Sequence, residues 1–241
     1  MNTYKRILVK ISGESLASLD VQADEKFGMN EDMLNHVAHE IKSVHAKGVQ
    51  VALVVGGGNF FRGASTHLPT LDRATADYIG MLATVMNATA LKSVLEHIGV
   101  PARHMSAIPV SAVAEPYVRA RALNHLEKGS VVIFSGGTGN AFFTTDTAAV
   151  LRASELECDL LLKATKVDGI YCSDPMKNEL ATFYPQITYK DVMDKQLKVM
   201  DATAIALARE THLPIAVFSI YKQNNLSDVL AGQGKHTLIA Q

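Results

Sequence analysis

Residues 131–149 read VVIFSGGTGNAFFTTDTAA, and this stretch decides the fold. Its first four residues are apolar, which is typical of a strand buried in an α/β sheet. Gly136 and Gly137 then break the strand, and the apolar pattern of a helix begins just after Asp146. A glycine turn that leads from a strand into a helix N-terminus suits an anion, because the first helical N–H groups lack partners. The competing interpretation is a surface turn in which Asp146 only caps the helix.

Two other predicted strands carry a lysine near their carboxyl ends. Lys10 lies in the strand at 6–11, and Lys163 ends the strand at 159–163. Burying an unpaired ammonium group costs free energy. Lys10 therefore lies either on an edge strand in water or in a site that uses a cation. Because Lys163 repeats the arrangement, we favour the second interpretation for both lysines.

A second glycine turn follows the apolar strand at 49–55. Three glycines at 56–58 are followed by Arg62. Consecutive glycines expose N–H groups in a way that suits an anion, and an arginine can bind phosphate through two hydrogen bonds. Neither glycine turn is a dinucleotide fingerprint, because Phe61 and Phe142 stand where the third glycine is required. The phosphate-loop pattern G-x-x-x-x-G-K-[ST] does not occur in the sequence.

Predicted strands alternate with predicted helices along the chain, which indicates an α/β fold. We expect a three-layer sandwich with a mainly parallel central sheet and helices on both faces. Neither a linker nor a repeat interrupts the pattern, so we expect one domain over 1–241. Ligands of an open parallel sheet bind beyond the carboxyl ends of its strands. We expect helices over the following ranges: from the cap Asn30 to Gly48, 75–98, 115–128 with Pro116 in its first turn, 187–195 and 199–211.

Composition and charge exclude several other classes of protein. The formal net charge is -1, which argues against a nucleic-acid-binding surface. No continuous apolar run approaches the roughly 20 residues that span a bilayer, so we expect no membrane segment. Cys158 and Cys172 lack the spacing of metal ligands. Two thiols in 241 residues suggest a reducing compartment, and we expect the cytoplasm.

The residues themselves suggest a reaction between two phosphate-bearing ligands. Two glycine turns and two lysines meet at the same edge of the expected sheet. Phosphoryl transfer needs mainly positioning and neutralisation of the moving charge. Asp146 lies in a position to hold the lysines or to help position Mg²⁺. Asp77, near the start of a long helix, is either a surface carboxylate or a ligand for substrate hydroxyl groups.

Six motifs stand out along the chain: KISGE (10–14), VGGGNFFRG (55–63), GMLATVMN (80–87), TGNAFFTTD (138–146), LKATKVDG (162–169) and LKVMD (197–201). They resemble those of the bacterial uridylate kinases, a branch of the amino acid kinase family. The resemblance covers essentially the whole chain, and the block at 138–146 is its most specific part.

The resemblance implies transfer of the γ-phosphoryl group of ATP, bound as its Mg²⁺ complex, to the phosphate of UMP. Lys10 and Lys163 would stabilise the transferring group, and Asp146 would orient them. No residue is assigned to the metal, which ATP carries. The resemblance assigns ATP to Lys10, Ile11, Ser12, Gly13, Gly58, Arg62, Thr165, Tyr171 and Asp174. It assigns UMP to Gly57, Asp77, Thr138, Gly139, Asn140, Ala141, Phe142, Phe143, Thr144 and Thr145.

The resemblance has further implications for organisation and regulation. It implies that UMP binds mainly to residues up to about 150 and ATP mainly to about 151–241. It also implies a homohexamer, activation by GTP and inhibition by UTP. The chain departs from the family at Ala141, where a proline is common, and in the loop at 16–28, which is longer.

Three alternatives remain open at this stage. The first is a kinase of a small carboxylate such as an N-acylated glutamate or aspartate, which needs no Thr- and Asn-rich loop at 138–145. The second is a non-catalytic nucleotide- or oxyanion-binding protein, against which both lysines and Asp146 argue. The third is a regulator that acts through DNA, for which the sequence offers no basic patch.

Overall fold

The computed structural model describes residues 4–18, 27–61, 70–173, 175, 178, 180–197 and 199–241. Arg62, Asp174 and residues 19–26 of the long loop, about which the sequence made predictions, lie outside these ranges. Within the described ranges, nine strands form one sheet in the order β4-β3-β5-β2-β1-β6-β10-β11-β9. Neighbouring strands are parallel except for β10 and β11, which confirms the expected mainly parallel sheet.

The strands of this sheet have the following bounds: β1 (Arg6–Ile11), β2 (Gln50–Val55), β3 (Ala102–Ser106), β4 (Glu115–Pro116), β5 (Val131–Ser135), β6 (Leu160–Thr165), β9 (Gln186–Thr188), β10 (Ile215–Ser219) and β11 (His236–Ala240). A separate hairpin consists of β7 (Ile170–Tyr171) and β8 (Phe183–Tyr184). The helices are η1 (Gly13–Leu16), α1 (Glu31–His45), α2 (Arg73–His97), α3 (Arg119–Glu127), α4 (Thr145–Glu155), α5 (Tyr189–Asp194), α6 (Ala202–Glu210) and α7 (Asn225–Leu230).

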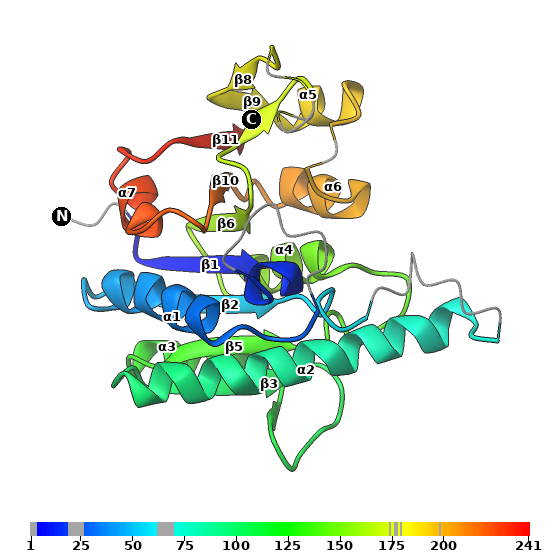
Figure 1. Ribbon diagram of the computed structural model, residues 1–241, viewed down its shortest axis with the longest axis vertical. Helices are drawn as coiled ribbons and strands as arrows, with labels where there is room; N and C mark the ends of the chain where they lie inside the picture. The colour runs from blue at the N-terminus through cyan, green and yellow to red at the C-terminus, as the bar shows by residue number, and fades with distance from the viewer. Residues whose placement is uncertain are drawn as a thin grey trace.

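Successive side chains of each strand point to opposite faces of the sheet, and helices bury both faces. In β1, Ile7, Val9 and Ile11 pack in one cluster with residues of α1, α2 and α7. Leu8 packs in a second cluster with residues of α3, α4 and α6. Figure 1 shows α1 and α2 in front of the sheet and α4 behind it. The expected three-layer sandwich is therefore present, and its central strands read as almost continuous apolar runs because both faces are covered.

The helix expected at 115–128 is wrong at its beginning. Glu115 and Pro116 form the short edge strand β4, which pairs with the end of β3. The Tyr117 N–H donates to the carbonyl of Ser106 at 2.9 Å, which continues this pairing. Proline is tolerated on an edge strand because its missing N–H leaves no partner unsatisfied. The helix α3 begins only at Arg119.

The long helix α2 is partly a core helix and partly exposed. Within the described part of the chain it is the one helix long and apolar enough to cross a membrane by length and composition. Ala88, Leu91 and Leu95, however, are fully buried in the same cluster as β1 and β2. A core helix meets the same criterion. At its other end, Tyr78, Leu82 and Met86 are exposed.

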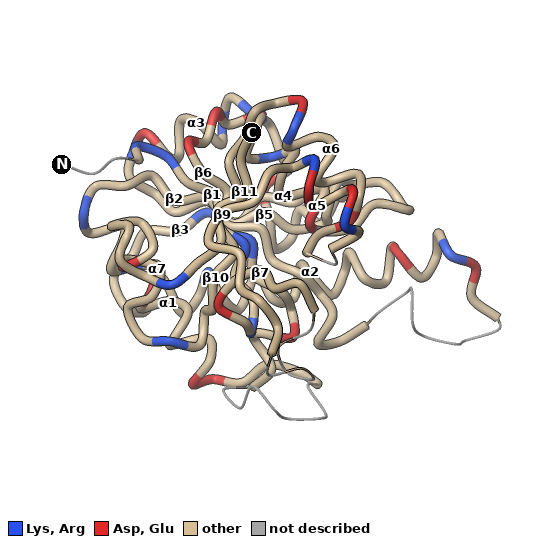
Figure 2. The backbone as a smooth tube through the Cα atoms, turned by 90° about the horizontal axis from the view of Figure 1, so that it is seen from above, with Lys and Arg blue, Asp and Glu red and all other residues tan. Residues whose placement is uncertain are grey.

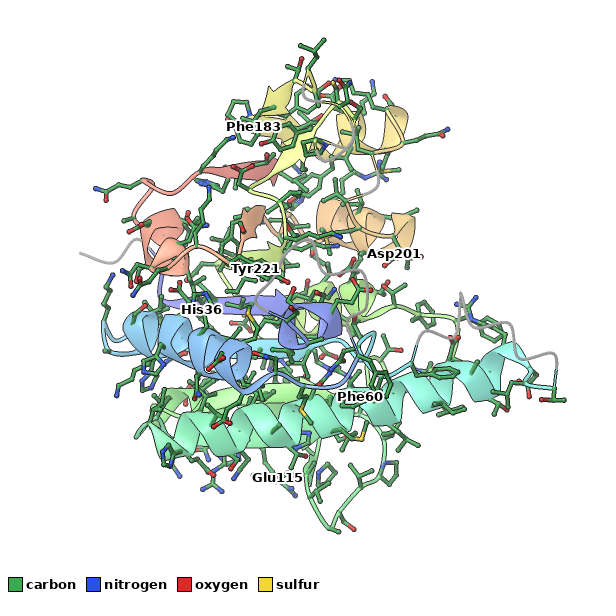
Figure 3. The ribbon with its side chains drawn as sticks, in the orientation of Figure 1. His36, Phe60, Glu115, Phe183, Asp201 and Tyr221 are labelled. Atoms are coloured by element: carbon green, nitrogen blue, oxygen red, sulfur yellow. The ribbon has the colours of Figure 1, made fainter. Side chains whose placement is uncertain are left out.

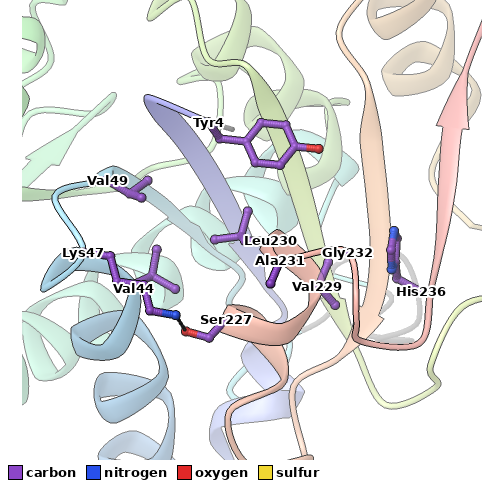
Figure 4. A pocket seen from close by; sticks show the side chains of 10 residues that line it. All are labelled: Tyr4, Val44, Lys47, Val49, Ser227, Val229, Leu230, Ala231, Gly232 and His236. Atoms are coloured by element: carbon purple, nitrogen blue, oxygen red, sulfur yellow. Dashed lines mark hydrogen bonds between the residues drawn. The ribbon is translucent and has the colours of Figure 1, made fainter. Parts of the chain in front are cut away.

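Charged residues are spread over many elements (Figure 2), and a cavity lies near the C-terminal end of α1. In Figure 2, basic and acidic positions are spread over many elements of the backbone, in keeping with the net charge of -1. A cavity of about 420 Å³ lies among the C-terminal end of α1, the residues before β1 and β2, and α7. Its lining includes Tyr4, Lys47 and His236, and Figure 4 shows the hydrogen bond from Lys47 to Ser227 there. The cavity shares no residue with the lysine site described below.

Candidate active site

Lys10 and Lys163 lie next to each other in the middle of the sheet. β1 and β6 are parallel neighbours, and their register pairs these two residues. Each lysine is two positions after a leucine, Leu8 or Leu161, whose side chain packs on the face covered by α4. Alternation along a strand therefore directs both lysines to that face. Two ammonium groups so close together repel each other, so the pair needs a counter-ion.

Asp146 supplies this counter-ion from the first turn of α4. Its Oδ1 lies 2.8 Å from Lys10 Nζ, and its Oδ2 lies 2.6 Å from Lys163 Nζ. Thr144, rather than Asp146, caps the helix, because its Oγ1 accepts the N–H groups of Asp146 and Thr147. The interpretation of Asp146 as a mere capping residue is thus wrong. Its carboxylate is left available for the lysines.

Two lysines and one carboxylate share a site that is largely buried. Burial raises the pKa of the Asp146 carboxyl, but the two ammonium groups outweigh burial and hold that pKa below its usual range. Burial also lowers the pKa of the Lys163 ammonium, and Asp146 opposes this only in part. Lys163 Nζ donates to the carbonyl of Val199 as well. Two cations against one anion in a poorly solvated place attract a further anion.

The first glycine turn closes over the carboxyl ends of β1 and β2. The Gly56 N–H donates to the carbonyl of Ile11 at 2.8 Å, and Ser12 Oγ caps η1 through the Ser15 N–H. A Cβ on Gly13 would lie only 2.6 Å from the Gly58 nitrogen, so the two backbones can meet only without a side chain there. The structure therefore brings together the predicted ATP residues Ile11, Ser12, Gly13 and Gly58.

The second glycine turn and the loop that follows it contact α2. Asp77 Oδ2 accepts the N–H of Phe142 at 2.8 Å, and Phe142 has a positive φ of 71°. Gly57 packs so closely on α2 that a Cβ would lie 2.7 Å from the Gly80 carbonyl oxygen. Of the predicted UMP residues, Asp77 thus contacts the predicted loop at 138–145, and Gly57 packs on the same helix. Phe142 and Phe143 are exposed within that loop.

Two further predicted ATP residues, Thr165 and Tyr171, lie at the end of β6 and after it. Thr165, two residues after Lys163, donates through Oγ1 to the Val167 carbonyl at 2.6 Å. Tyr171 donates through its hydroxyl to Asp168 Oδ1 at 2.5 Å and receives a hydrogen bond from Lys235. Arg62 and Asp174 are outside the described residues, so their predicted roles stay predictions.

The sequence reasoning did not assign Asp201 to the site, although it lies in the last of the six motifs. Asp201 caps α6 through the Ala204 N–H and accepts the hydroxyl groups of Thr144 and Thr147 at 2.5 and 2.9 Å. Figure 3 shows Asp201 at the beginning of α6. This carboxylate therefore ties the start of α4, and with it Asp146, to the C-terminal part of the chain. The signal was its position in that motif.

No protein metal cluster is formed by the described residues. Among them, no group of three or more His, Cys, Asp and Glu residues could hold a metal ion. Both carboxylate oxygens of Asp146 face ammonium groups. These residues therefore do not form a metal site of their own.

The buried cations and the open glycine turns lie where parallel sheets bind ligands, and they suit phosphate groups. They place the protein among the nucleotide- and phosphate-binding α/β proteins. The sequence model of the Amino acid kinase family matches residues 5–219. The chain therefore belongs to this family of phosphotransferases.

Individual proteins of high sequence identity also match this chain. A uridylate kinase of Rickettsia bellii is 54% identical over 238 residues, covering 99% of this chain and 98% of that protein. The crystal structure of UMP kinase from Bacillus anthracis is similar with a TM-score of 0.91 and 41% identity, covering 98% of this chain and 96% of that one. UMP kinase from Ureaplasma parvum has a TM-score of 0.89 and 37% identity, covering 98% and 99%.

The lysine pair yields a prediction that separates catalysis from folding. Lys10→Met leaves Asp146 paired with Lys163 and removes the repulsion between the two lysines, so we expect the variant to stay folded. Turnover should fall by at least about 10²-fold, because one of two cations for the moving charge is lost. Denaturant unfolding and steady-state kinetics measure the two effects. Lys92→Met, which removes a half-exposed lysine paired with Glu96, is the matched control and should keep full activity.

The support of the second glycine turn yields a pH prediction. His104 Nε2 lies 2.7 Å from Ser135 Oγ, just before Gly136. Burial, with a contribution from Lys92, lowers the pKa of His104 from 6.5 to about 4. Below pH 6.5 the unfolded chain binds a proton that the folded protein does not, so stability falls with decreasing pH and this loss ends near pH 4.

Between about pH 7 and pH 5, the loss from His104 should reach about 2 kcal/mol of unfolding free energy. Urea unfolding at both pH values measures it, and His104→Gln should remove most of this dependence. An equal pH dependence in the original and the variant would contradict the assignment.

Proposed function

We propose that the chain transfers the γ-phosphoryl group of ATP to UMP, giving ADP and UDP. The observation that carries the proposal is the Lys10–Asp146–Lys163 cluster, with Nζ-to-carboxylate distances of 2.8 and 2.6 Å. It lies toward the carboxyl ends of β1 and β6, and the two glycine turns follow the carboxyl ends of β2 and β5 in the same parallel sheet. The names of the relatives support UMP as the acceptor, since proteins at 54% and 41% identity are a uridylate kinase and a UMP kinase.

The reaction asks for charge stabilisation more than for proton transfer. A phosphate monoester is mostly dianionic at pH 7, so the UMP phosphate attacks without a general base. Asp146, ion-paired on both oxygens, is suited to orient cations and not to accept a proton. Lys10 and Lys163 neutralise the charge that builds up on the oxygens of the moving group. Asp146 also favours the charged form of Lys163 against the effect of burial.

The two nucleotides divide the chain between them in this proposal. ATP binds Lys10, Ser12, Gly13 and Gly58 with its phosphates and lies mainly against residues from about 151 to 241. UMP binds Gly57, Asp77 and the loop at 138–145, within residues up to about 150. The contact of Asp77 with the Phe142 N–H supports a common acceptor site, because it joins two predicted UMP elements. Mg²⁺ carried by ATP would supply further charge neutralisation.

Assembly and regulation extend the proposal. Tyr78, Leu82 and Met86 follow each other at intervals of four residues on α2, so they form one exposed apolar row. We infer that this row contributes to subunit contacts in a homohexamer. The resemblance adds activation by GTP, inhibition by UTP and a place in the cytoplasm, and these stay predictions.

Acceptor choice tests the proposal directly. A coupled ADP-release assay compares UMP, CMP, dUMP, N-acetylglutamate and aspartate as acceptors with ATP and Mg²⁺. We expect turnover with UMP and none with the two amino-acid compounds, because the loop at 138–145 suits a nucleotide. Turnover on an amino acid without turnover on UMP would favour the small-carboxylate kinase instead. Nucleotide binding without turnover would favour a non-catalytic binding protein.

The exposed row on α2 gives a second test. Leu82→Lys places a charge in the middle of the row and should shift the mass in analytical ultracentrifugation to smaller species, because burying an unpaired charge is unfavourable. Glu96→Lys, an exposed change on the same helix, is the control and should leave the mass unchanged. If both variants kept the mass of the original protein, the row would not be a subunit contact.

A further inference from the structure

Two buried polar residues of α2 are unexplained by the site as described so far. Thr84 is 2% exposed and Asn87 is fully buried, and neither contacts the lysine cluster. Each makes a hydrogen bond to one of the two glycine turns. Buried polar groups are costly unless their hydrogen bonds are made, and networks that are fully made fix a single geometry.

Asn87 holds the first glycine turn. Its Nδ2 donates to the Gly56 carbonyl at 2.7 Å and lies 2.7 Å from Asn59 Oδ1. Asn59 Nδ2 donates back to Asn87 Oδ1 at 3.0 Å, which makes a reciprocal amide pair. Asn59 is itself 1% exposed, and its Nδ2 also donates to the Gly28 carbonyl. The pair therefore fixes both ends of the turn at 56–59. Figure 3 shows Phe60, the residue after this turn, beside α2.

Thr84 holds the second glycine turn. Its hydroxyl accepts the Gly136 N–H at 2.7 Å and donates to the Met81 carbonyl of its own helix at 2.6 Å. Gly136 has a positive φ of 75°, and it is the first residue of the turn that leads to the predicted UMP loop. The helix therefore orients the Thr84 hydroxyl group, and this group accepts the hydrogen bond from the Gly136 N–H.

Spacing on the helix links the two anchors. Thr84 and Asn87 are three residues apart, so they lie on the same side of α2 and about 4.5 Å apart along its axis. Gly57 packs on α2 close to Thr84. There is no room for a Cβ on Gly57, because it would clash with the Gly80 carbonyl oxygen and the Ala83 Cβ. A helix resists stretching, and the two anchoring residues are less than one helical turn apart. A short segment of α2 therefore fixes the distance between the two glycine turns.

We propose that Thr84 and Asn87 are positioning residues that set the distance between the phosphate of UMP and the phosphates of ATP. The inference rests on the proposed function, which assigns Gly57 and Gly58 of the first turn to UMP and ATP and the loop after the second turn to UMP. The two residues act through the turns and touch neither nucleotide. A misplacement of about 1 Å between reacting groups can cost about 10²-fold in rate.

The two anchors predict different kinetic signatures. Thr84→Val keeps the shape but removes the acceptor for the Gly136 N–H, so the KM for UMP should rise about tenfold while the KM for ATP changes less than about twofold. Asn87→Leu releases the turn that faces both nucleotides, so kcat should fall about 10²-fold. Amide hydrogen exchange should become faster at Gly136 in the first variant and at 56–59 in the second.

Matched controls separate positioning from general damage. Thr84→Ser restores the hydroxyl and should recover the original KM for UMP. Ser93→Ala removes an exposed hydroxyl farther along the same helix, and it should leave both KM values unchanged. Unfolding by urea shows whether Asn87→Leu is folded, and Asn87→Ala provides a second variant if it is not.

The experiment distinguishes this inference from the proposed function. If the original protein phosphorylates UMP but Thr84→Val keeps its KM values and its exchange at Gly136, the positioning role is overturned. Equal increases in both KM values would overturn it as well, because they indicate general loosening. Turnover of the original protein on another acceptor overturns only the proposed function, and the variants are then compared on that acceptor.

Discussion

The site depends on one electrostatic constraint, the need for an anion between two lysines that the sheet places next to each other. The register of β1 and β6 pairs Lys10 with Lys163, and alternation directs both to the face that α4 covers. Asp146 satisfies both from the first turn of α4. The threonine cap and its bond to Asp201 hold that turn in place. In the proposed function, the transferring phosphoryl group binds beside these two lysines.

A second constraint is mechanical and comes from α2. The helix contacts both glycine turns through Thr84 and Asn87 and the predicted UMP loop through Asp77. Its other side carries the exposed apolar row centred on Leu82. The same helix therefore connects substrate positioning with the surface proposed for subunit contact.

Much of the fold was predictable because its determinants are local. Apolar runs bounded by glycine fixed the strands, and Asn30 and Gly48 mark the ends of α1 and its following turn as predicted. The error at Glu115 arose because pairing with β3 is a tertiary contact that the helix-like Glu-Pro signal does not contain. The pairing of Lys10 with Lys163 was equally hidden, since it depends on strand order across about 150 residues of sequence. Thr84 and Asn87 lie in the motif at 80–87, but polar residues in an apolar helix do not reveal their partners.

The most direct measurement is a crystal structure with a bisubstrate analogue in which adenosine and uridine are joined through a chain of phosphates. The account predicts the bridging phosphates within hydrogen-bonding distance, about 3 Å, of the Nζ atoms of Lys10 and Lys163. It also predicts the uridine half beside Asp77 and the loop at 138–145. Phosphates bound away from both lysines, with Asp146 still paired in place, would contradict the account.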